Sequence, residues 1–315
     1  MFENIHDLIR RYDRIILHRH AHPDGDAIGS QVGLKHLILE NFPGKTVLCV
    51  GDPAGRYAFL PDAVMDEVPD EAFAGALSII LDTSGHGLIS DDRYRLAETT
   101  ARIDHHLFLE QIAEEEVVDP SFESCCGLIA AMAEELGWRV PDSAALLLYA
   151  GMVTDSGRFR YDATTPRTLR LAANLLSHGL DTNALYRDLY ALPMEEVQMR
   201  ASFTSRIQRT PRGAAYIYTD RETFQSLHTD FFTVSRGMVS VMSDIEGVEI
   251  WANFTENEEG VVCELRSVFR DVSPIAFKYG GGGHPKACGA TVKDKEEALR
   301  MLQDLDAMLP PEQGV

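Results

Sequence analysis

Six side chains that could bind metal ions lie in four short segments of this 315-residue chain. The segments are HAHPDGDAIGS (20–30), LDTSG (81–85), DHH (104–106) and GMVTDSG (151–157). The candidate metal ligands are His20, Asp24, Asp26, Asp82, His105 and Asp155. Taken singly, an aspartate after a strand usually caps a helix or forms a turn, and a lone histidine usually packs against its neighbours. Taken together, the four carboxylates would repel one another unless protons or cations neutralised them.

A pair of metal ions explains this set of ligands. Mixed carboxylate and imidazole ligands suit Mn²⁺, and also Zn²⁺ or Fe²⁺. The set is larger than one ion needs, so we expect two ions about 3.5–4 Å apart that share one carboxylate. Such a pair activates water and binds a phosphoryl oxygen, and its usual reaction is hydrolysis of a phosphoester. For Asp104, a hydrogen bond to a histidine is an alternative to metal binding.

A glycine-rich segment in the second half of the chain could bind phosphate. In KYGGGGHPKACGA (278–290), the N–H groups of Gly280–Gly283 can surround an oxyanion, and His284 follows them directly. Arg266 ends the preceding apolar segment CELRS, and its guanidinium could grip a phosphate from there. The alternatives are a flexible turn for the glycines and an exposed edge position for the arginine.

Short apolar strands alternate with helical patterns in the first half of the chain, and the candidate ligands follow the strands. We expect strands at 13–17, 45–50, 77–82, 100–104 and 115–119, and helices at 26–41, 124–137, 143–154 and 166–178. This alternation predicts an α/β fold with a mainly parallel sheet flanked by helices. Open sheets of this kind bind ligands at the carboxyl ends of their strands. The fold would therefore bring the candidate ligands to one edge of the sheet.

The second half of the chain predicts a smaller α/β unit. Residues 181–209 read as helical, strands follow at 213–219, 248–256 and 260–267, and a helix lies near 294–308. We therefore expect a first domain at 1–185, a helical linker at 186–212 and a second domain at 213–315.

Composition argues against several classes of protein. The net charge of −20 is unlike that of proteins that track long nucleic acids, which usually carry a basic excess, so a phosphate-rich ligand would be short. No apolar run of about 18 residues predicts a membrane helix, and the charged start MFENIHDLIRRYDR does not read as a secretory signal. The five cysteines are scattered except for the adjacent Cys125 and Cys126, which suits a reduced cytoplasmic protein rather than a disulfide framework.

The motifs resemble, in order and type, those of the DHH phosphoesterase superfamily. HAHPDGDAIGS, LDTS, DHH and GMVTDSG match its catalytic domain, and GGGGH (280–284) matches the DHHA1 type of second domain. The resemblance covers nearly the whole chain and implies two Mn²⁺ ions, or other divalent ions in their place. The first ion would be held by His20, Asp24 and Asp82. The second ion would be held by Asp26, Asp82, His105 and Asp155.

The same resemblance implies which groups act on the substrate. His106 would contact the scissile phosphate, and Asp82 would be catalytic through the ions that it shares. The substrate-binding residues of the second domain would be Arg266, Ser267, Gly281, Gly282, Gly283 and His284.

Length and layout most resemble the family branch of oligoribonucleases and PAP phosphatases, called NrnA-type. That branch implies hydrolysis of short RNA oligonucleotides to 5′-mononucleotides, with the linear dinucleotide pApA and adenosine 3′,5′-bisphosphate as further substrates. Neither long duplex nucleic acid nor a membrane is an expected partner, and family likeness suggests a homodimer. The alternative from a different class is a non-catalytic nucleotide-binding or sensor protein that retains the metal site.

Two positions depart from the family pattern. Leu109 stands three residues after the DHH motif, where family members often have asparagine, and Gly85-His86 follows LDTS, where other residues are usual. Neither position is a predicted metal ligand. Both leave the substrate preference open.

Overall fold

The computed structural model describes residues 1–311, and the chain divides into two units, one of Met1–Ala191 and one that begins at Leu192. Each unit has its own sheet and its own hydrophobic core. In the part of the chain that is described, no helix is both long and apolar enough to cross a membrane.

The sheet of the first unit consists of five parallel strands in the order β2-β1-β3-β4-β5. The strands are β1 (Arg14–His18), β2 (Thr46–Cys49), β3 (Leu77–Leu81), β4 (Thr99–Asp104) and β5 (Glu115–Val118). All five strands expected from the sequence are confirmed, and so is their parallel arrangement. The chain crosses from one side of β1 to the other between β2 and β3, so the strand order reverses between β1 and β3.

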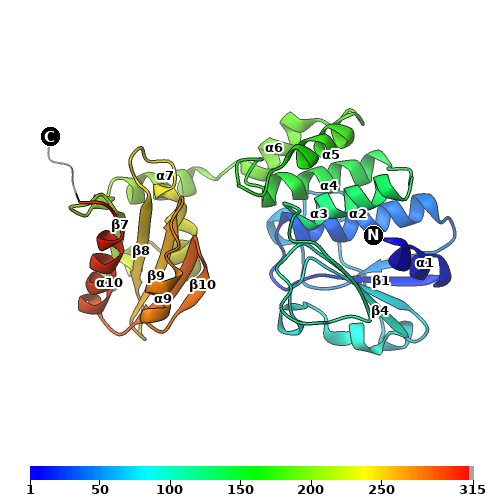
Figure 1. Ribbon diagram of the computed structural model, residues 1–315, viewed down its shortest axis with the longest axis horizontal. Helices are drawn as coiled ribbons and strands as arrows, with labels where there is room; N and C mark the ends of the chain where they lie inside the picture. Colours follow the sequence, from blue (N-terminus) through cyan, green and yellow to red (C-terminus); the bar gives the residue numbers. More distant parts are fainter. Residues whose placement is uncertain (312–315) are drawn as a thin grey trace. The chain divides into compact units, whose positions relative to one another are not determined.

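Helices cover one face of this sheet, as Figure 1 shows. The four expected from the sequence are α2 (Gly25–Asn41), α3 (Cys125–Glu135), α4 (Asp142–Asp155) and α5 (Pro166–Leu176). They bury apolar side chains against alternate strand residues such as Ile15, Leu17 and Ile79. Helix α1 (Glu3–Arg11), which the sequence pattern did not predict, packs into the same core through Ile5 and Ile9.

The other face of the sheet is covered by loops with short 3₁₀ turns. The strand residues on this face, Ile16 and Ile80, pack against Phe73 and Tyr94 from these turns and the segments next to them. The turns are η1 (Gly55–Tyr57), η2 (Asp70–Ala72), η3 (His86–Leu88) and η4 (Asp92–Leu96). Both faces are therefore buried, which explains why apolar residues in β1 and β3 follow one another without alternation.

Two helices, α6 (Thr182–Tyr190) and α7 (Met194–Thr204), form most of the segment at 181–209. They are separated at Ala191–Pro193, because proline cannot donate a helical hydrogen bond and disfavours helix in the residue before it. The prediction of helix is wrong for the end of this segment. Gln208–Arg209 form strand β6, which pairs with β7.

The second unit has a six-stranded sheet in the order β10-β11-β9-β8-β7-β6. Its other strands are β7 (Ala215–Thr219), β8 (Ile250–Glu256), β9 (Val261–Ser267), β10 (Gly282–His284) and β11 (Ala287–Val292). The three expected strands, β7, β8 and β9, are confirmed, whereas β10 and β11 were not predicted. The glycines of β10 have little β-propensity, so its strand structure comes from pairing with β11, which itself pairs with β9.

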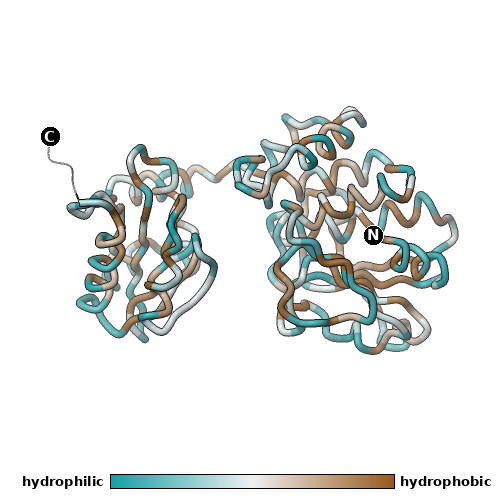
Figure 2. Tube along the Cα trace, in the orientation of Figure 1, coloured by the Kyte–Doolittle hydropathy of each residue, from teal (hydrophilic) through white to brown (hydrophobic). Residues whose placement is uncertain are grey.

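Both faces of the second sheet are also packed. Helices α9 (Ser273–Lys278) and α10 (Lys295–Ala307) cover one face through residues such as Ala276 and Met301. The other face packs against α7 and the turns η5 (Thr233–Gly237) and η6 (Met238–Met242). A further short helix is α8 (Arg221–Ser226). In Figure 2 the hydrophobic stretches of the chain run along the strands of both sheets.

Candidate active site

The predicted metal ligands gather at the carboxyl ends of β1, β3 and β4 and at the end of α4. They form three overlapping groups in which the possible ligand atoms lie within 4.8 Å of one another. The groups are His20 with Asp24 and Asp82, Asp26 with His105 and Asp155, and Asp82 with His105 and His106. We call the six residues His20, Asp24, Asp26, Asp82, His105 and Asp155 the acidic cluster. It lies where the strand order reverses, which is where such sheets bind ligands.

Asp82 joins the groups of the acidic cluster. Its Oδ2 lies 3.4 Å from Nε2 of His20, and its Oδ1 lies 3.4 Å from Nε2 of His105. The side chain is buried, and Oδ1 has no hydrogen-bond partner. The backbone of Asp82 has a φ of 50°, a strained conformation for a residue other than glycine, and such strain concentrates at functional sites.

His20 and His105 turn the same ring atom toward the carboxylates. Nδ1 of His20 lies 2.8 Å from the carbonyl oxygen of Ala21, and Nδ1 of His105 lies 3.3 Å from that of Phe122. A carbonyl can only accept, so each Nδ1 donates its proton there, and each Nε2 is the ring atom that faces the carboxylates. Metal-binding histidines are oriented by this kind of hydrogen bond.

Asp26 is held by the N-terminus of α3. Its two carboxylate oxygens accept hydrogen bonds from the backbone N–H groups of Cys125 and Cys126, at 2.7 and 2.9 Å. Burial, together with the charge of Asp82, nevertheless raises the pKa of Asp26 to about 7. Burial and the charge of Asp26 also raise the pKa of Asp155, to about 8. The chain alone does not neutralise the negative charge that it concentrates here.

Asp24 caps helix α2, the role that aspartate usually has after a strand. Its Oδ1 accepts hydrogen bonds from the backbone N–H groups of Asp26 and Ala27. It also lies 3.8 Å from Nε2 of His20. Burial lowers the pKa of His20, but hydrogen bonds with Asp24 and Asp82 outweigh burial and raise it to about 11. Positive charge is therefore strongly favoured between these carboxylates.

Two fully buried arginines support the acidic cluster, and the sequence analysis identified neither. Arg19 donates from Nη1 to the carbonyl oxygen of His20 and from Nε to the side chain of Gln31. Arg102 donates from Nη2 to Asp104 at 2.5 Å. A signal for Arg102 was present, because residues 102 and 104 of a strand point to the same face. Arg19 had no such signal.

Asp104 orients His106 rather than joining the acidic cluster, as the alternative reading of the sequence allowed. Its Oδ1 accepts a hydrogen bond from Nδ1 of His106 at 2.7 Å, while its Oδ2 pairs with Arg102. Burial lowers the pKa of His106, but the hydrogen bond with Asp104 and the charge of Asp82 raise it. The His106 side chain remains 41% exposed, so a substrate can reach it.

The residues of the acidic cluster fit divalent metal ions. The donor set combines carboxylate oxygens with imidazole Nε2 atoms, the mixture that suits Mn²⁺, Zn²⁺ or Fe²⁺. The partnerless Oδ1 of buried Asp82 is an acceptor that the protein itself does not satisfy. A cation bound there would supply the missing partner and offset the mutual repulsion of the carboxylates.

The predicted phosphate-binding residues of the second unit line a separate pocket of about 670 Å³, which we call the glycine pocket. The predicted residues that line it are Arg266, Gly281, Gly282, Gly283 and His284. Ser267 does not line it, and its hydroxyl donates to the carbonyl oxygen of Arg270. Lys278, which lies two residues before the glycine run, does not line the pocket either. Its Nζ pairs with Asp304 at 2.7 Å.

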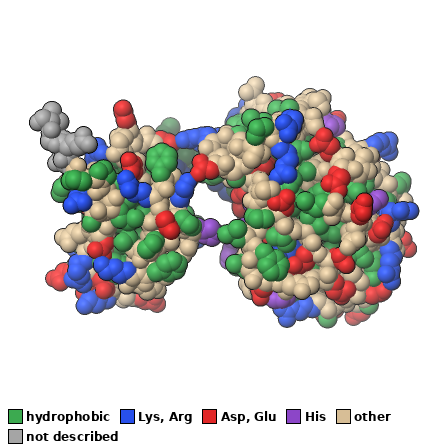
Figure 3. Space-filling view, viewed as in Figure 1, with side chains coloured by type: hydrophobic (Ala, Val, Ile, Leu, Met, Phe, Trp, Pro, Cys, Tyr) green, Lys and Arg blue, Asp and Glu red, His purple; other side chains and the backbone are tan. Residues whose placement is uncertain are grey.

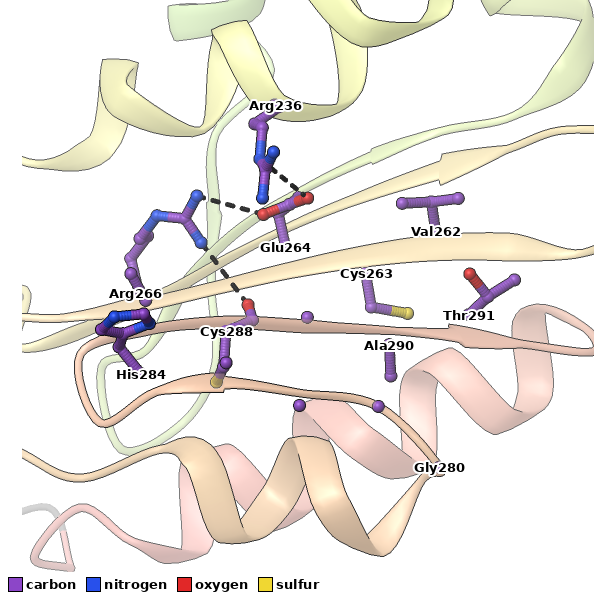
Figure 4. A pocket seen from close by; sticks show the side chains of 15 residues that line it. Arg236, Val262, Cys263, Glu264, Arg266, Gly280, His284, Cys288, Ala290 and Thr291 are labelled. Carbon is purple, nitrogen blue, oxygen red and sulfur yellow. Dashed lines mark hydrogen bonds and ion pairs between the residues drawn. The ribbon is translucent and has the colours of Figure 1, made fainter. Parts of the chain in front are cut away.

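Arg266 is held in place by three acceptors. Its guanidinium donates to the carbonyl oxygen of Leu265 at 2.9 Å and lies 3.4 Å from that of Cys288. Its Nη2 is 3.0 Å from Glu264, as Figure 4 shows. On the other side of this carboxylate, Nε of Arg236 lies 3.6 Å away. Glu264 and Arg236 were not identified from the sequence, because nothing in the spacing links residue 236 to strand β9.

The glycines of this pocket are needed for close packing of the backbone. A Cβ at Gly281 would lie 2.0 Å from the carbonyl oxygen of Gly289, so no side chain fits there. Gly282–His284 form the edge strand β10 rather than a free loop. His284 is exposed at the end of this strand. The pocket therefore combines an edge backbone with the Arg266 guanidinium.

On the face of the molecule in Figure 3, Lys and Arg side chains are interspersed with Asp and Glu on both units. No continuous basic stripe crosses this face among the described residues. This distribution agrees with the net charge of −20.

Two family models match the chain. The model described as "DHH family, N-terminal domain" matches residues 14–152, and the model described as "DHHA1 domain" matches residues 231–309. The first match contains the ligands that follow β1, β3 and β4, and the second contains the glycine pocket residues from Arg236 to Thr291.

Three relatives are similar over most of their length. The bifunctional oligoribonuclease and PAP phosphatase NrnA of Bacillus subtilis is 34% identical, and the alignment covers 95% of this chain and 96% of that protein. A probable protein of the same name from Streptococcus mutans is 36% identical, with 98% and 99% covered. The protein of this name from Thermus thermophilus is 30% identical, with 89% and 84% covered.

A solved structure has the same fold. The crystal structure of an exopolyphosphatase-related protein from Bacteroides fragilis superposes with a TM-score of 0.85 at 24% sequence identity. The superposition covers 98% of this chain and 95% of that one. This likeness concerns the fold of the two units and not their activity.

Proposed function

This chain belongs to the DHH family of phosphoesterases, and on that premise we propose that it hydrolyses short oligoribonucleotides and adenosine 3′,5′-bisphosphate (PAP). The substrates are those in the names of the relatives from Bacillus subtilis and Streptococcus mutans. Products of the first reaction would be 5′-mononucleotides, and the second would remove the 3′-phosphate.

The observation that carries this proposal is the position of Asp82. Its two carboxylate oxygens face two different groups of possible ligands, through Nε2 of His20 on one side and Nε2 of His105 on the other. One ion would be held by His20, Asp24 and Asp82, and the other by Asp26, Asp82, His105 and Asp155. When bound, such ions supply an activated water and neutralise charge on a phosphoryl oxygen.

His106 would contact the scissile phosphate. The hydrogen bond to Asp104 occupies Nδ1, which leaves Nε2 free to reach a phosphate oxygen. Arg102 fixes Asp104 from the other side, so the ring has few alternative orientations. A preorganised donor of this kind stabilises charge that develops in the transition state.

In the second unit, the glycine pocket would bind substrate phosphate. Arg266 carries donors that suit a phosphate, and the backbone at Gly281–Gly283 and the side chain of His284 border the same space. Ser267 would act through the backbone conformation at Arg270, because its hydroxyl is engaged there. We assign residues 1–185 to catalysis and 213–315 to substrate binding, with 186–212 between them.

Four finer features belong to the same proposal. Mn²⁺ is the expected ion, because it accepts both carboxylate and imidazole ligands. The linear dinucleotide pApA is an expected substrate, since it is an oligoribonucleotide of the shortest length. All five cysteines are free and buried, which suits a cytoplasmic protein. A homodimer is expected from family likeness.

The test is direct hydrolysis by the purified full chain. With Mn²⁺ present, a labelled RNA trimer and pApA should be converted to mononucleotides, and PAP to adenosine 5′-monophosphate. Hydrolysis of pyrophosphate alone, or of none of these compounds, would contradict the proposal and leave only the metal site.

A further inference from the structure

Three large apolar side chains directly follow the DHH motif and are exposed. Leu107, Phe108 and Leu109 are 66%, 60% and 72% accessible. Single exposed apolar residues are ordinary on protein surfaces, but three in succession beside His106 are not. Leu109 is also one of the two positions that depart from the family pattern. We call these three residues the apolar loop.

The apolar loop is tied to the protein at both of its ends. Before it, Asp104 is paired with the buried Arg102. After it, the carbonyl oxygen of Glu110 accepts a hydrogen bond from Nη1 of Arg102 at 3.1 Å, and its carboxylate accepts one from the backbone N–H of His86 at 2.9 Å. The same arginine therefore holds the apolar loop at both ends. These contacts fix the loop in its exposed position.

Phe108 presents its ring to the surface. The guanidinium of Arg102 lies 6.0 Å from the centre of this ring, within the range of a cation–π contact. The residue is nevertheless 60% exposed, so most of its surface remains open to a ligand. An aromatic ring fixed at one side and open at the other is suited to stack on a second flat ring.

We propose that the apolar loop is the stacking surface for a nucleobase next to the scissile phosphate, with Phe108 as the residue that stacks. This inference rests on the proposed function. Phe108 is two residues from His106, so their Cα atoms are at most about 7 Å apart. A base is joined to its phosphate by a single ribose, which is a comparable separation. Stacking of this kind accepts any base, because every base has a flat π-face.

The size of the apolar loop favours a nucleobase over a protein partner. A stable contact between two proteins usually needs about 800 Å² on each side, with 20–30 residues. Three side chains cover far less, but they match one base with its sugar. Leu107 and Leu109 flank Phe108 and would exclude water from the edges of the stacked rings.

The test compares Phe108 variants on substrates that keep or lack each base. The full chain with Mn²⁺ would be assayed on pApA and on two analogues, each with one adenine replaced by hydrogen. Phe108→Ala should lower kcat/KM on pApA by roughly 5- to 150-fold, and Phe108→Trp should retain activity, because the larger ring also stacks. Leu169→Ala, an exposed apolar residue on α5, is the matched control and should change nothing.

The analogues separate stacking from a structural effect. Removal of the stacked adenine should cost the wild-type chain a similar factor, and Phe108→Ala should then add less than about twofold on that analogue. Unchanged activity of Phe108→Ala on pApA would overturn the inference. So would a loss that persists in full on both analogues, since the ring would then act on the fold and not on a base.

Two further outcomes are distinguishable. If the wild-type chain hydrolyses neither pApA nor an RNA trimer, the proposed oligoribonuclease activity fails and this inference fails with it. If Phe108→Ala instead changes the molar mass measured by light scattering while activity per chain is kept, the apolar loop is a contact between copies of the chain. That result would also overturn the inference.

Discussion

The acidic cluster of the first unit and the glycine pocket of the second hold their charged groups in different ways. In the acidic cluster, Asp26 and Asp82 are almost completely buried, and Asp26 is fixed by backbone N–H groups of a helix. In the glycine pocket, Arg266 and Glu264 remain partly exposed and hold each other. The first site thus concentrates negative charge that protons or a bound cation must neutralise, whereas the charged side chains of the second already pair with one another.

This difference sets the consequences of mutation. A buried charge whose partner is removed costs several kcal/mol, because it can no longer be solvated. A partly exposed ion pair is worth far less, since water screens it. Substitutions in the acidic cluster and its supports should therefore abolish activity or unfold the unit. Substitutions in the glycine pocket should weaken substrate binding and leave the fold intact.

The largest expected effect is that of Asp82→Asn. Both groups of ligands share this carboxylate, so its loss should remove several kcal/mol of transition-state stabilisation and lower kcat by roughly 10³-fold or more. The measurement is turnover of an RNA trimer with Mn²⁺, together with metal content by atomic emission. Full activity of this variant would show that the metal ligands have been assigned wrongly.

Arg102→Leu should have the next largest effect, on stability. It leaves Asp104 buried without its arginine partner, which should lower the free energy of unfolding of the first unit by about 3–5 kcal/mol. Urea denaturation measures this change. Arg139→Leu, which removes an exposed ion pair with Glu40, is the control and should cost less than about 1 kcal/mol.

Arg102→Lys sharpens the same prediction. A lysine keeps the positive charge but cannot donate to Asp104 and to the Glu110 carbonyl with one planar group. Stability should be partly restored, while kcat stays low because His106 loses its orientation. Equal recovery of stability and kcat would mean that the charge alone matters.

Metal binding should stabilise the two units unequally. At a free Mn²⁺ concentration of 100 times the dissociation constant, a single bound ion adds about 2.7 kcal/mol to the stability of the unit that holds it. Calorimetry should show a higher melting temperature for the first unit only. An equal shift of both transitions would contradict the contrast between the acidic cluster and the glycine pocket.

The two sites also differ in how far the sequence could predict them. All six residues of the acidic cluster were predicted, because each follows a strand or ends an apolar helix and parallel strands deliver their carboxyl ends to one edge. The fold of the first unit followed from the same alternation of apolar segments. Its supporting residues Arg19 and Arg102 were missed. Arg19 follows β1 and no spacing links it to the candidate ligands, and the only signal for Arg102 was the strand face that it shares with Asp104.

The glycine pocket was predicted only in part. Its backbone and Arg266 were expected, but Arg236 and Glu264 meet across segments that are distant in the sequence. Buried Asn253 makes this meeting possible, because it donates to the carbonyl oxygens of Val234 and Ser235 and so holds the turn that carries Arg236. Ser267 was expected in the pocket but is turned toward Arg270. Such contacts depend on tertiary packing, and no periodic pattern in the sequence predicts them.

Arg266→Ala should have the smallest effect of these substitutions, and it tests the glycine pocket. Loss of a charged hydrogen bond to phosphate should raise KM for an RNA trimer roughly 10- to 150-fold, equivalent to about 1.5–3 kcal/mol. The value of kcat should change less than about twofold, because the contact is the same in the ground state and the transition state. Glu264 keeps Arg236 as a partner, so the unfolding of the second unit should be nearly unchanged.

The matched control for Arg266→Ala is Arg221→Ala, which removes an exposed arginine paired with Glu258 in the same unit. This control should leave KM and kcat unaltered. A fall in kcat as large as that of Asp82→Asn would mean that Arg266 acts on the reacting phosphate itself. The glycine pocket would then share the catalytic role that we propose for the acidic cluster.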